Sequence, residues 1–233
     1  MLGHTRAMGT QDLRYRRWQV IARRHPSAFL LAAQLLSLVA YPLLEGDTGR
    51  ILFGAFGVAI ATLAVWVVMR SPAVKWVAWL IAVPAVLLTL VAALLPGTGT
   101  ALAATLLESA LYFYAAASLT AYMLSDHRVT SDELFAAGAT FTLLMWAFAY
   151  AFVACQAIYP GAFTGMVEPE RARTWMELLF LSATNLSATG LGDVLPVHPA
   201  ARVLVVLEQF CGVGYIAVVV SRLIGLTVAG VRR

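Results

Sequence analysis

Residues 187–193 read "SATGLGD" and lie between two long apolar runs. The seven residues include two glycines, two hydroxyl side chains and one aspartate. Backbone groups outside a helix or a closed barrel are costly in hydrocarbon, because nothing there satisfies their hydrogen bonds. If the flanking runs cross a membrane, this stretch must be buried in protein or must line a water-filled path.

The composition of the whole chain is that of an integral membrane protein. Hydrophobic residues make up 61% of the 233 and charged residues 12%, and the mean hydropathy is +0.82, well above that of a soluble domain. An α-helix of about 20 apolar residues crosses a hydrocarbon core of about 30 Å. The sequence therefore predicts an all-α membrane protein with six transmembrane helices, near residues 27–44, 51–69, 75–95, 100–124, 134–159 and 200–228.

The distribution of basic residues predicts that both termini face the cytoplasm. In that orientation twelve of the 16 lysines and arginines lie inside, and Arg50, Arg171, Arg173 and Arg202 lie outside. Cytoplasmic connections of membrane proteins carry such an excess. We therefore predict a multi-pass protein of the plasma (inner) membrane. Its basic N-terminal segment, residues 1–26, is expected to meet the lipid bilayer rather than nucleic acid.

The outer connection that precedes residue 187 is too apolar for a solvated loop. Residues 174–186, "TWMELLFLSATNL", form a run of about thirteen helix-compatible residues, which is too short to span the membrane and typical of a re-entrant helix. Thr174 and Glu177 have the spacing of a capping box, in which each side chain satisfies a backbone N–H of the other residue. We expect the short helix to begin there.

The "SATGLGD" stretch follows this short helix directly. Gly190 and Gly192 alternate with Leu191, and glycine permits the unusual dihedral angles by which successive carbonyl groups can face one axis. Carbonyl groups arranged in this way can replace the hydration shell of an ion. We expect Asp193 to lie at the outer mouth of such a path, where copies of it would form a ring of negative charge.

Residues 179–199, "LFLSATNLSATGLGDVLPVHP", resemble the pore helix and selectivity filter of the potassium channel superfamily, whose filter reads TVGYG followed by aspartate. The resemblance covers roughly residues 130–228 and extends to a group of small bacterial ion-channel proteins. Gly212 matches a common hinge glycine of the pore-lining helix. The resemblance implies K⁺ binding by filter carbonyls and no cofactor other than permeant ions. The filter residues that it implies are Ala188 at the inner end, Thr189, Gly190, Leu191 and Gly192.

Departures from the family pattern bear on selectivity. Ala188 stands where the family has a threonine whose hydroxyl helps to form the innermost ion site. Leu191 replaces the filter tyrosine, and Leu181 replaces a pore-helix tryptophan that ties to it in many relatives, so the aromatic bracing is missing. Potassium selectivity is the preferred interpretation, because backbone carbonyls do most of the coordination. The alternatives are a poorly selective monovalent cation channel and a non-channel accessory or transport protein.

We expect the chain to have three domains. Residues 1–26 form the basic cytoplasmic segment, residues 27–129 a four-helix peripheral membrane bundle, and residues 130–233 a pore domain of outer helix, pore helix, filter and inner helix. Residues 100–124 contain no lysine or arginine, which excludes an arginine-rich voltage sensor. One chain supplies one filter strand, so a homotetramer is implied. No catalytic motif is visible, and we predict that the protein is not an enzyme. An accessory regulatory subunit stays an open question.

Two carboxyl groups fall inside the apolar runs, where a charge is expensive. For Glu108 we expect a protonated or paired group that packs the bundle. Glu208 shares a helix face with Gly212 and Tyr215. It is either hydrogen-bonded to the short helix, or it acts as a proton-sensitive gate or as an attractor of cations. Gly212 can bend the helix for gating or permit close helix packing. Arg222 is expected to anchor the cytoplasmic end at the interface.

Overall fold

The computed structural model of the chain describes residues 25–43, 46–69, 71, 74–95, 99–125 and 131–231. The predicted basic segment therefore lies outside the described residues as far as residue 24. The described helices are α2 (Pro26–Ala40), the 3-10 helix η1 (Tyr41–Leu43), α3 (Gly46–Val68), α4 (Lys75–Leu94), α5 (Thr100–Leu124), α6 (Ser131–Ile158), α7 (Trp175–Leu186) and α8 (Pro199–Val231). Strands β1 (Phe163–Gly165) and β2 (Val194–Pro196) form one short ladder. The all-helical prediction is confirmed apart from this ladder.

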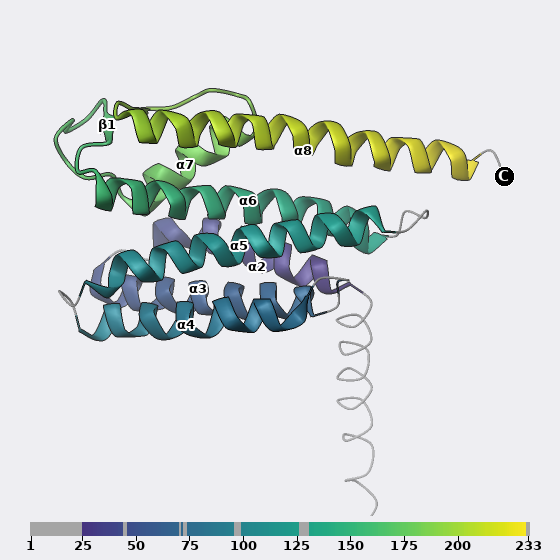
Figure 1. Cartoon of the computed structure of the whole chain (residues 1–233), viewed down its shortest axis with the longest axis horizontal. Coiled ribbons are helices and arrows are strands. Elements are labelled where there is room, and N and C mark those ends of the chain that lie inside the picture. Colours follow the sequence, from purple (N-terminus) through teal and green to yellow (C-terminus); the bar gives the residue numbers. More distant parts are fainter. Residues whose placement is uncertain are drawn as a thin grey trace, which may run out of the picture.

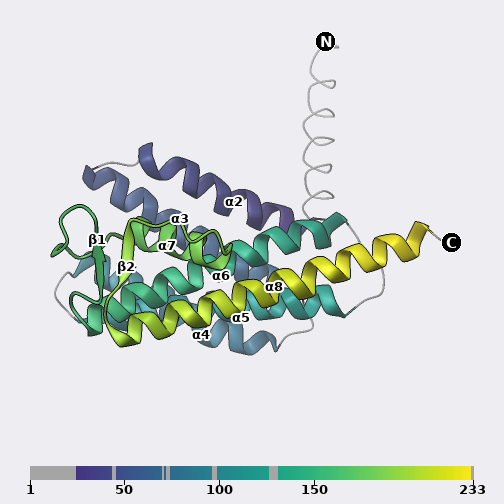
Figure 2. The ribbon, with the colours of Figure 1, turned by 90° about the horizontal axis from the view of Figure 1, so that it is seen from above.

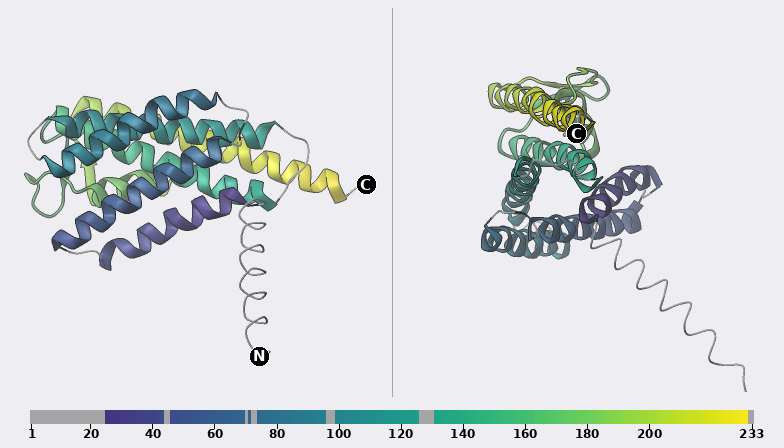
Figure 3. Two further views of the ribbon diagram at one scale, coloured as in Figure 1. Left: turned by 90° about the horizontal axis from the view of Figure 1, so that it is seen from below. Right: turned by 90° about the vertical axis from the view of Figure 1, so that its right-hand side faces the viewer.

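The long helices run roughly along one direction and form an elongated bundle (Figure 1). Helix α6 lies at its centre and contacts α2, α5, α7 and α8. Helices α3 and α4 lie on one side of the bundle and α8 on the opposite side (Figures 1 and 3). The C-terminal end of α8 projects beyond the other long helices, which is also visible from above (Figure 2).

Four described helices are long and apolar enough to cross a membrane. They are the spans Lys75–Ala92, Thr100–Leu124, Asp132–Ile158 and Pro199–Arg222, which lie in α4, α5, α6 and α8. The first two predicted spans fall on α2, which has 15 residues, and on α3, which has 23. Pro42 contributes to the end of α2, because proline has no N–H to continue the hydrogen-bond ladder. Four long apolar helices indicate a membrane-embedded protein, and the count of six spans stays a prediction.

An aromatic cluster fills the centre of the bundle and connects α5, α6 and α7. Trp146 of α6 is buried, with its ring centroid 5.7 Å from that of Tyr112 and 5.1 Å from that of Trp175. Tyr150, one turn further along α6, stacks on Tyr112 at 5.7 Å. Edge-to-face and offset ring pairs of this kind stabilise beyond their buried area. The cluster therefore holds the start of α7 against the centre of the bundle.

Polar contacts at the first turn of α6 connect three helices. The Asp132 carboxylate accepts hydrogen bonds from the Ser27 backbone N–H at 3.2 Å and from the Ser27 hydroxyl at 3.1 Å, and so caps the first turn of α2. The buried Glu133 carboxylate lies 3.7 Å from the Arg222 guanidinium of α8. Arg222, expected as an interfacial anchor, thus forms an ion pair that connects α8 to α6.

Candidate functional site

Helix α7 lies between α6 and α8 and begins with the predicted capping box. The Glu177 backbone N–H donates to the Thr174 hydroxyl at 3.3 Å, and the Thr174 backbone N–H donates to the Glu177 carboxylate at 2.6 Å. Arg171 also donates to the Glu177 carboxylate at 2.8 Å. Partial burial alone would raise the pKa of Glu177, but the hydrogen bonds from Thr174 and Arg171 outweigh it and lower the pKa below its ordinary value. The capping-box prediction is confirmed.

The connection into α7 is fixed by Gln156, at the end of α6, and by a buried arginine. The Gln156 amide donates to the Arg173 carbonyl at 3.0 Å and accepts from the Arg173 N–H at 2.7 Å. The Arg173 guanidinium donates to the carbonyls of Val167, Glu168 and Arg171. A Cβ at Gly165 would overlap this guanidinium, so a larger residue there would displace the Arg173 side chain. Arg173 was expected only as an outer-side charge, and the structure adds a structural role for its side chain.

The backbone after α7 turns its N–H groups back toward that helix. The Ala188 N–H donates to the Asn185 carbonyl at 3.0 Å, and the N–H groups of Thr189 and Gly190 both donate to the Thr184 carbonyl at 3.0 Å. Within the described part of the chain, no hydrogen bond ends on the carbonyl oxygen of any residue from 188 to 192. The same five residues are exposed, with 70% of Leu191 accessible. This stretch therefore presents carbonyl groups without hydrogen-bond partners on the surface of a single chain.

The left-handed backbone angles in this stretch differ in part from the prediction. Gly190 has a φ of +67°, as expected of a residue that must be glycine. The second left-handed residue is Ala188, with a φ of +57°, and Gly192 is outside the left-handed region. The expectation that both glycines serve unusual dihedral angles is thus wrong for Gly192. Ala188 follows the C-cap Ser187, and its left-handed angle turns the chain so that the next N–H, that of Thr189, reaches back to the Thr184 carbonyl.

The outer end of the stretch is held by the β1–β2 ladder. The strands are antiparallel, with Gly165 paired to Val194 and Phe163 to Pro196. The Met166 N–H donates to the Asp193 carbonyl at 3.0 Å, which extends the ladder by one bond. The Asp193 residue is exposed at the point where the irregular stretch ends. Residues 188–192 are therefore held at one end by the C-terminus of α7 and at the other end by strand β2.

Three contacts pack α8 against α7. The Glu208 side chain, with 0% of the residue accessible, accepts a hydrogen bond from the Ser182 hydroxyl, which also lies 2.8 Å from the Met145 carbonyl. Next to it, the Gln209 amide donates to the Asn185 side chain at 3.1 Å.

The third contact is at Gly212, where a Cβ would overlap the Leu186 carbonyl. Helix α8 runs through Gly212 without a break. One turn further on, the Tyr215 hydroxyl donates to the Ala137 carbonyl at 2.6 Å. Of the two interpretations considered for Gly212, close helix packing is the one that this structure displays. The shared helix face of Glu208, Gly212 and Tyr215 indeed meets α7 and α6.

Glu108 belongs to the peripheral bundle and not to this site. The Thr89 hydroxyl of α4 donates to its carboxylate at 2.8 Å, so Glu108 packs α5 against α4 as expected. Sequence reasoning missed Ser182, Asn185 and Gln209 as partners. Their polar character in apolar helices was the available signal, but their pairing requires the packing of α7 on α8. No group of three or more His, Cys, Asp or Glu could hold a metal ion among the described residues.

The geometry defines a class of protein: a membrane-embedded helical protein in which a short helix and an exposed carbonyl-bearing stretch lie between two long apolar helices. Residues 135–229 match a protein-family model described as "ion channel", so this segment is similar to a potassium-channel-like ion channel family. The predicted resemblance is confirmed. No curated protein and no solved structure matches the chain.

Proposed function

We propose that the protein is a potassium-selective channel subunit that conducts K⁺ passively through a tetrameric filter. The observation that carries the proposal is the backbone of residues 188–192, whose carbonyls have no hydrogen-bond partner while three N–H groups are turned away toward α7. Carbonyl oxygens of Thr189, Gly190, Leu191 and Gly192 are suited to replace the hydration shell of K⁺. Ala188 closes the inner end.

Electrostatics around the stretch also favour a cation. The C-terminal end of α7 precedes residue 188, and the C-terminus of a helix carries a partial negative charge. Asp193 follows the stretch and is exposed, so four copies would concentrate cations at the outer mouth. In this proposal six helices span the plasma membrane, both termini are cytoplasmic, and α7 is the re-entrant pore helix.

A poorly selective cation pore is the second candidate, and a specific observation favours it. The Leu191 side chain is exposed, and Leu181 of α7 occupies the place where many relatives have a bracing tryptophan. A filter without this aromatic bracing can adjust its width to ions of different size. Ala188 also lacks a hydroxyl for the innermost ion site.

The reversal potential of the purified protein in planar bilayers, measured with K⁺ on one side and Na⁺ on the other, separates the candidates. A potential near the potassium equilibrium value supports a K⁺-selective filter. A potential near zero, with anions excluded, identifies a poorly selective cation pore. A chain that carries no cation current, even after reconstitution as the assembled oligomer, contradicts both.

A further inference from the structure

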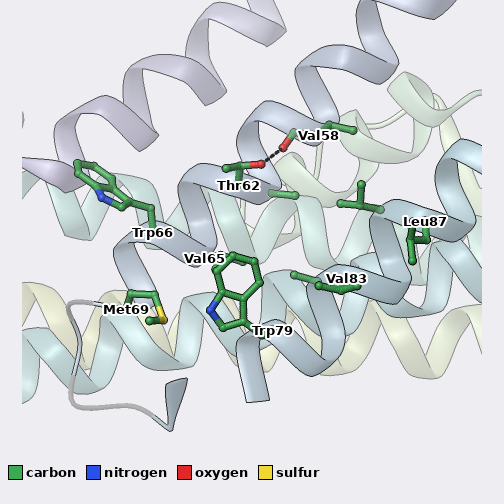
Figure 4. Close-up of a pocket in the computed structure, with 11 residues that line it drawn as sticks. Val58, Thr62, Val65, Trp66, Met69, Trp79, Val83 and Leu87 are labelled. Atoms are coloured by element: carbon green, nitrogen blue, oxygen red, sulfur yellow. Dashed lines mark hydrogen bonds between the residues drawn. The ribbon is translucent and has the colours of Figure 1, made fainter. Parts of the chain in front are cut away.

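A pocket of about 430 Å³ opens between α3 and α4, on the side of the bundle opposite α8 (Figure 4). Its walls are apolar and include Trp66 of α3, Met69 just after α3, and Trp79 and Val83 of α4. The one hydroxyl side chain in the lining, Thr62, donates to the Val58 carbonyl of its own helix at 2.8 Å (Figure 4). The lining therefore offers a ligand mostly apolar contact, and the indole N–H of Trp79 is among its few polar groups.

A basic residue lies one helical turn from the pocket lining. Its lining residues on α4 are three or four positions apart, so they form one helix face. One turn before Trp79 on that face lies Lys75, the exposed first residue of α4. The start of α4 is fixed to α5, because the Tyr114 hydroxyl donates to the Val74 carbonyl at 2.6 Å. Residues 70–75 carry a second basic residue, Arg70, and no acidic residue in the sequence.

With α4 placed across a membrane, the pocket faces hydrocarbon and not water. Helix α4 is one of the four described helices suited to cross a membrane. Trp79, Val83 and Leu87 line the pocket and are each about half exposed on its open side. Tryptophan and lysine near the end of a spanning helix are typical of the interface between hydrocarbon and headgroups. The pocket thus runs from an interface with positive charge into the apolar layer.

We propose that this pocket binds one acyl chain of an anionic phospholipid whose headgroup meets the Lys75 ammonium. Apolar walls of this volume fit the common size of ligand sites, and they recognise a chain but not its headgroup. The headgroup preference comes from Lys75, because a basic residue at the membrane surface attracts anionic lipid. The site lies outside the segment matched to the ion channel family, and it depends on α4 spanning the membrane and not on ion conduction.

Quenching of tryptophan fluorescence by brominated lipids tests the proposal, because Trp66 and Trp79 line the pocket. The full chain is reconstituted in phosphatidylcholine with increasing fractions of brominated phosphatidylglycerol or brominated phosphatidylcholine. The signal of a variant with both tryptophans changed to phenylalanine is subtracted. We expect the pocket to prefer the anionic lipid about five-fold, the effect of one basic residue near the surface. Lys75→Gln should abolish this preference and keep quenching by both lipids.

Thr62→Phe should fill the pocket and lower the pocket quenching by either lipid, and Val83→Phe should do the same from the opposite wall. Leu80→Phe is the matched control, because Leu80 is 63% exposed on α4 and does not line the pocket. If both lipids quench equally, and if neither Thr62→Phe nor Val83→Phe changes the quenching, the tryptophans make only ordinary lipid contact. This result would overturn the proposal. No quenching by either lipid would also overturn it, since protein, such as a second copy of the chain, would then cover the pocket.

Discussion

At the scale of single residues, Gly190 is the glycine of residues 188–192 whose backbone is left-handed, while Gly192 is not. An L-residue in this conformation costs roughly 1–2 kcal/mol. We expect Gly190→Ala to abolish cation current and to lower stability by about that amount, without loss of the spanning helices. Current measurements and circular dichroism of the reconstituted variant check this.

Gly192→Ala is the matched control for the change in stability. Gly192 is outside the left-handed region, and a Cβ there would lie 3.5 Å from the nearest heavy atom, the Val194 carbonyl oxygen, which is ordinary contact. Its thermal stability should therefore stay near that of the native chain. A Gly190→Ala variant that conducts like the native chain would contradict the proposed role of this stretch.

The Glu208–Ser182 contact gives a second prediction at this scale. Ser182→Ala removes the hydroxyl from a fully buried carboxyl group and should cost about 1–3 kcal/mol. Glu208→Gln should be tolerated better, because its amide can donate to the Ser182 oxygen while that hydroxyl donates to Met145. Thermal unfolding of both single variants and the double variant measures the coupling, about 0.5–3 kcal/mol for residues in contact. Strictly additive effects would remove Glu208 from this structural role. A shifted pH profile of the current in Glu208→Gln would support the gate instead.

At the scale of elements, α8 approaches the end of α7 closely at Gly212. Gly212→Ala places a methyl group on the Leu186 carbonyl and should cost about 1–3 kcal/mol by overpacking. Gly214→Ala, two residues away on the same helix, meets nothing within 4 Å and should be neutral or slightly stabilising. Thermal unfolding in detergent compares the pair. Equal stability of the two variants would mean that α7 and α8 are not packed as described.

The start of α7 gives the pH prediction. The pKa of Glu177 is lowered in the folded protein, so its contribution to stability is complete above the unfolded pKa, ordinarily about 4.5. It is lost as the pH falls through the folded pKa. We expect the melting temperature of the native chain to fall more steeply below about pH 4.5 than that of Glu177→Gln. Parallel curves would show that the capping box does not depend on the Glu177 charge. As a control, Thr174→Ala should cost about 1 kcal/mol at neutral pH by loss of the cap.

At the scale of the whole molecule, the apolar surface of α8 fits the proposed homotetramer. Phe210 is 76% exposed on this helix, and it precedes the Gly212 contact by two residues. We expect the purified protein to have four times the chain mass of 25.1 kDa, and Phe210→Ala to weaken assembly by about ten-fold for each 1.4 kcal/mol of packing lost. Mass measurement in detergent checks both statements.

Leu94→Ala is the control for assembly, because Leu94 is equally exposed but lies at the end of α4, on the opposite side of the bundle. Its assembly should match that of the native chain. A native chain that stays monomeric in mild detergents and in bilayers would contradict the homotetramer and, with it, a filter made of four strands.

The sequence by itself determined the features that depend on neighbouring residues. Apolar runs predicted the positions of the long helices, and the Thr174–Glu177 spacing predicted the start of α7. Both are local features, because helix formation and capping involve residues within about one turn. The glycine-rich stretch after that helix was also located correctly, since a short helix and its following turn are local in sequence.

Only the tertiary structure decided which residues meet across helices. The pairing of Ser182 with Glu208, the contact of Gln156 with the Arg173 backbone and the ion pair of Glu133 with Arg222 join distant parts of the chain. The left-handed angle at Ala188 likewise accompanies the return of the Thr189 N–H to the Thr184 carbonyl of α7, and no residue preference of alanine predicts it. Such contacts depend on the rotation and spacing of whole helices, which hydrophobic periodicity sets only in part.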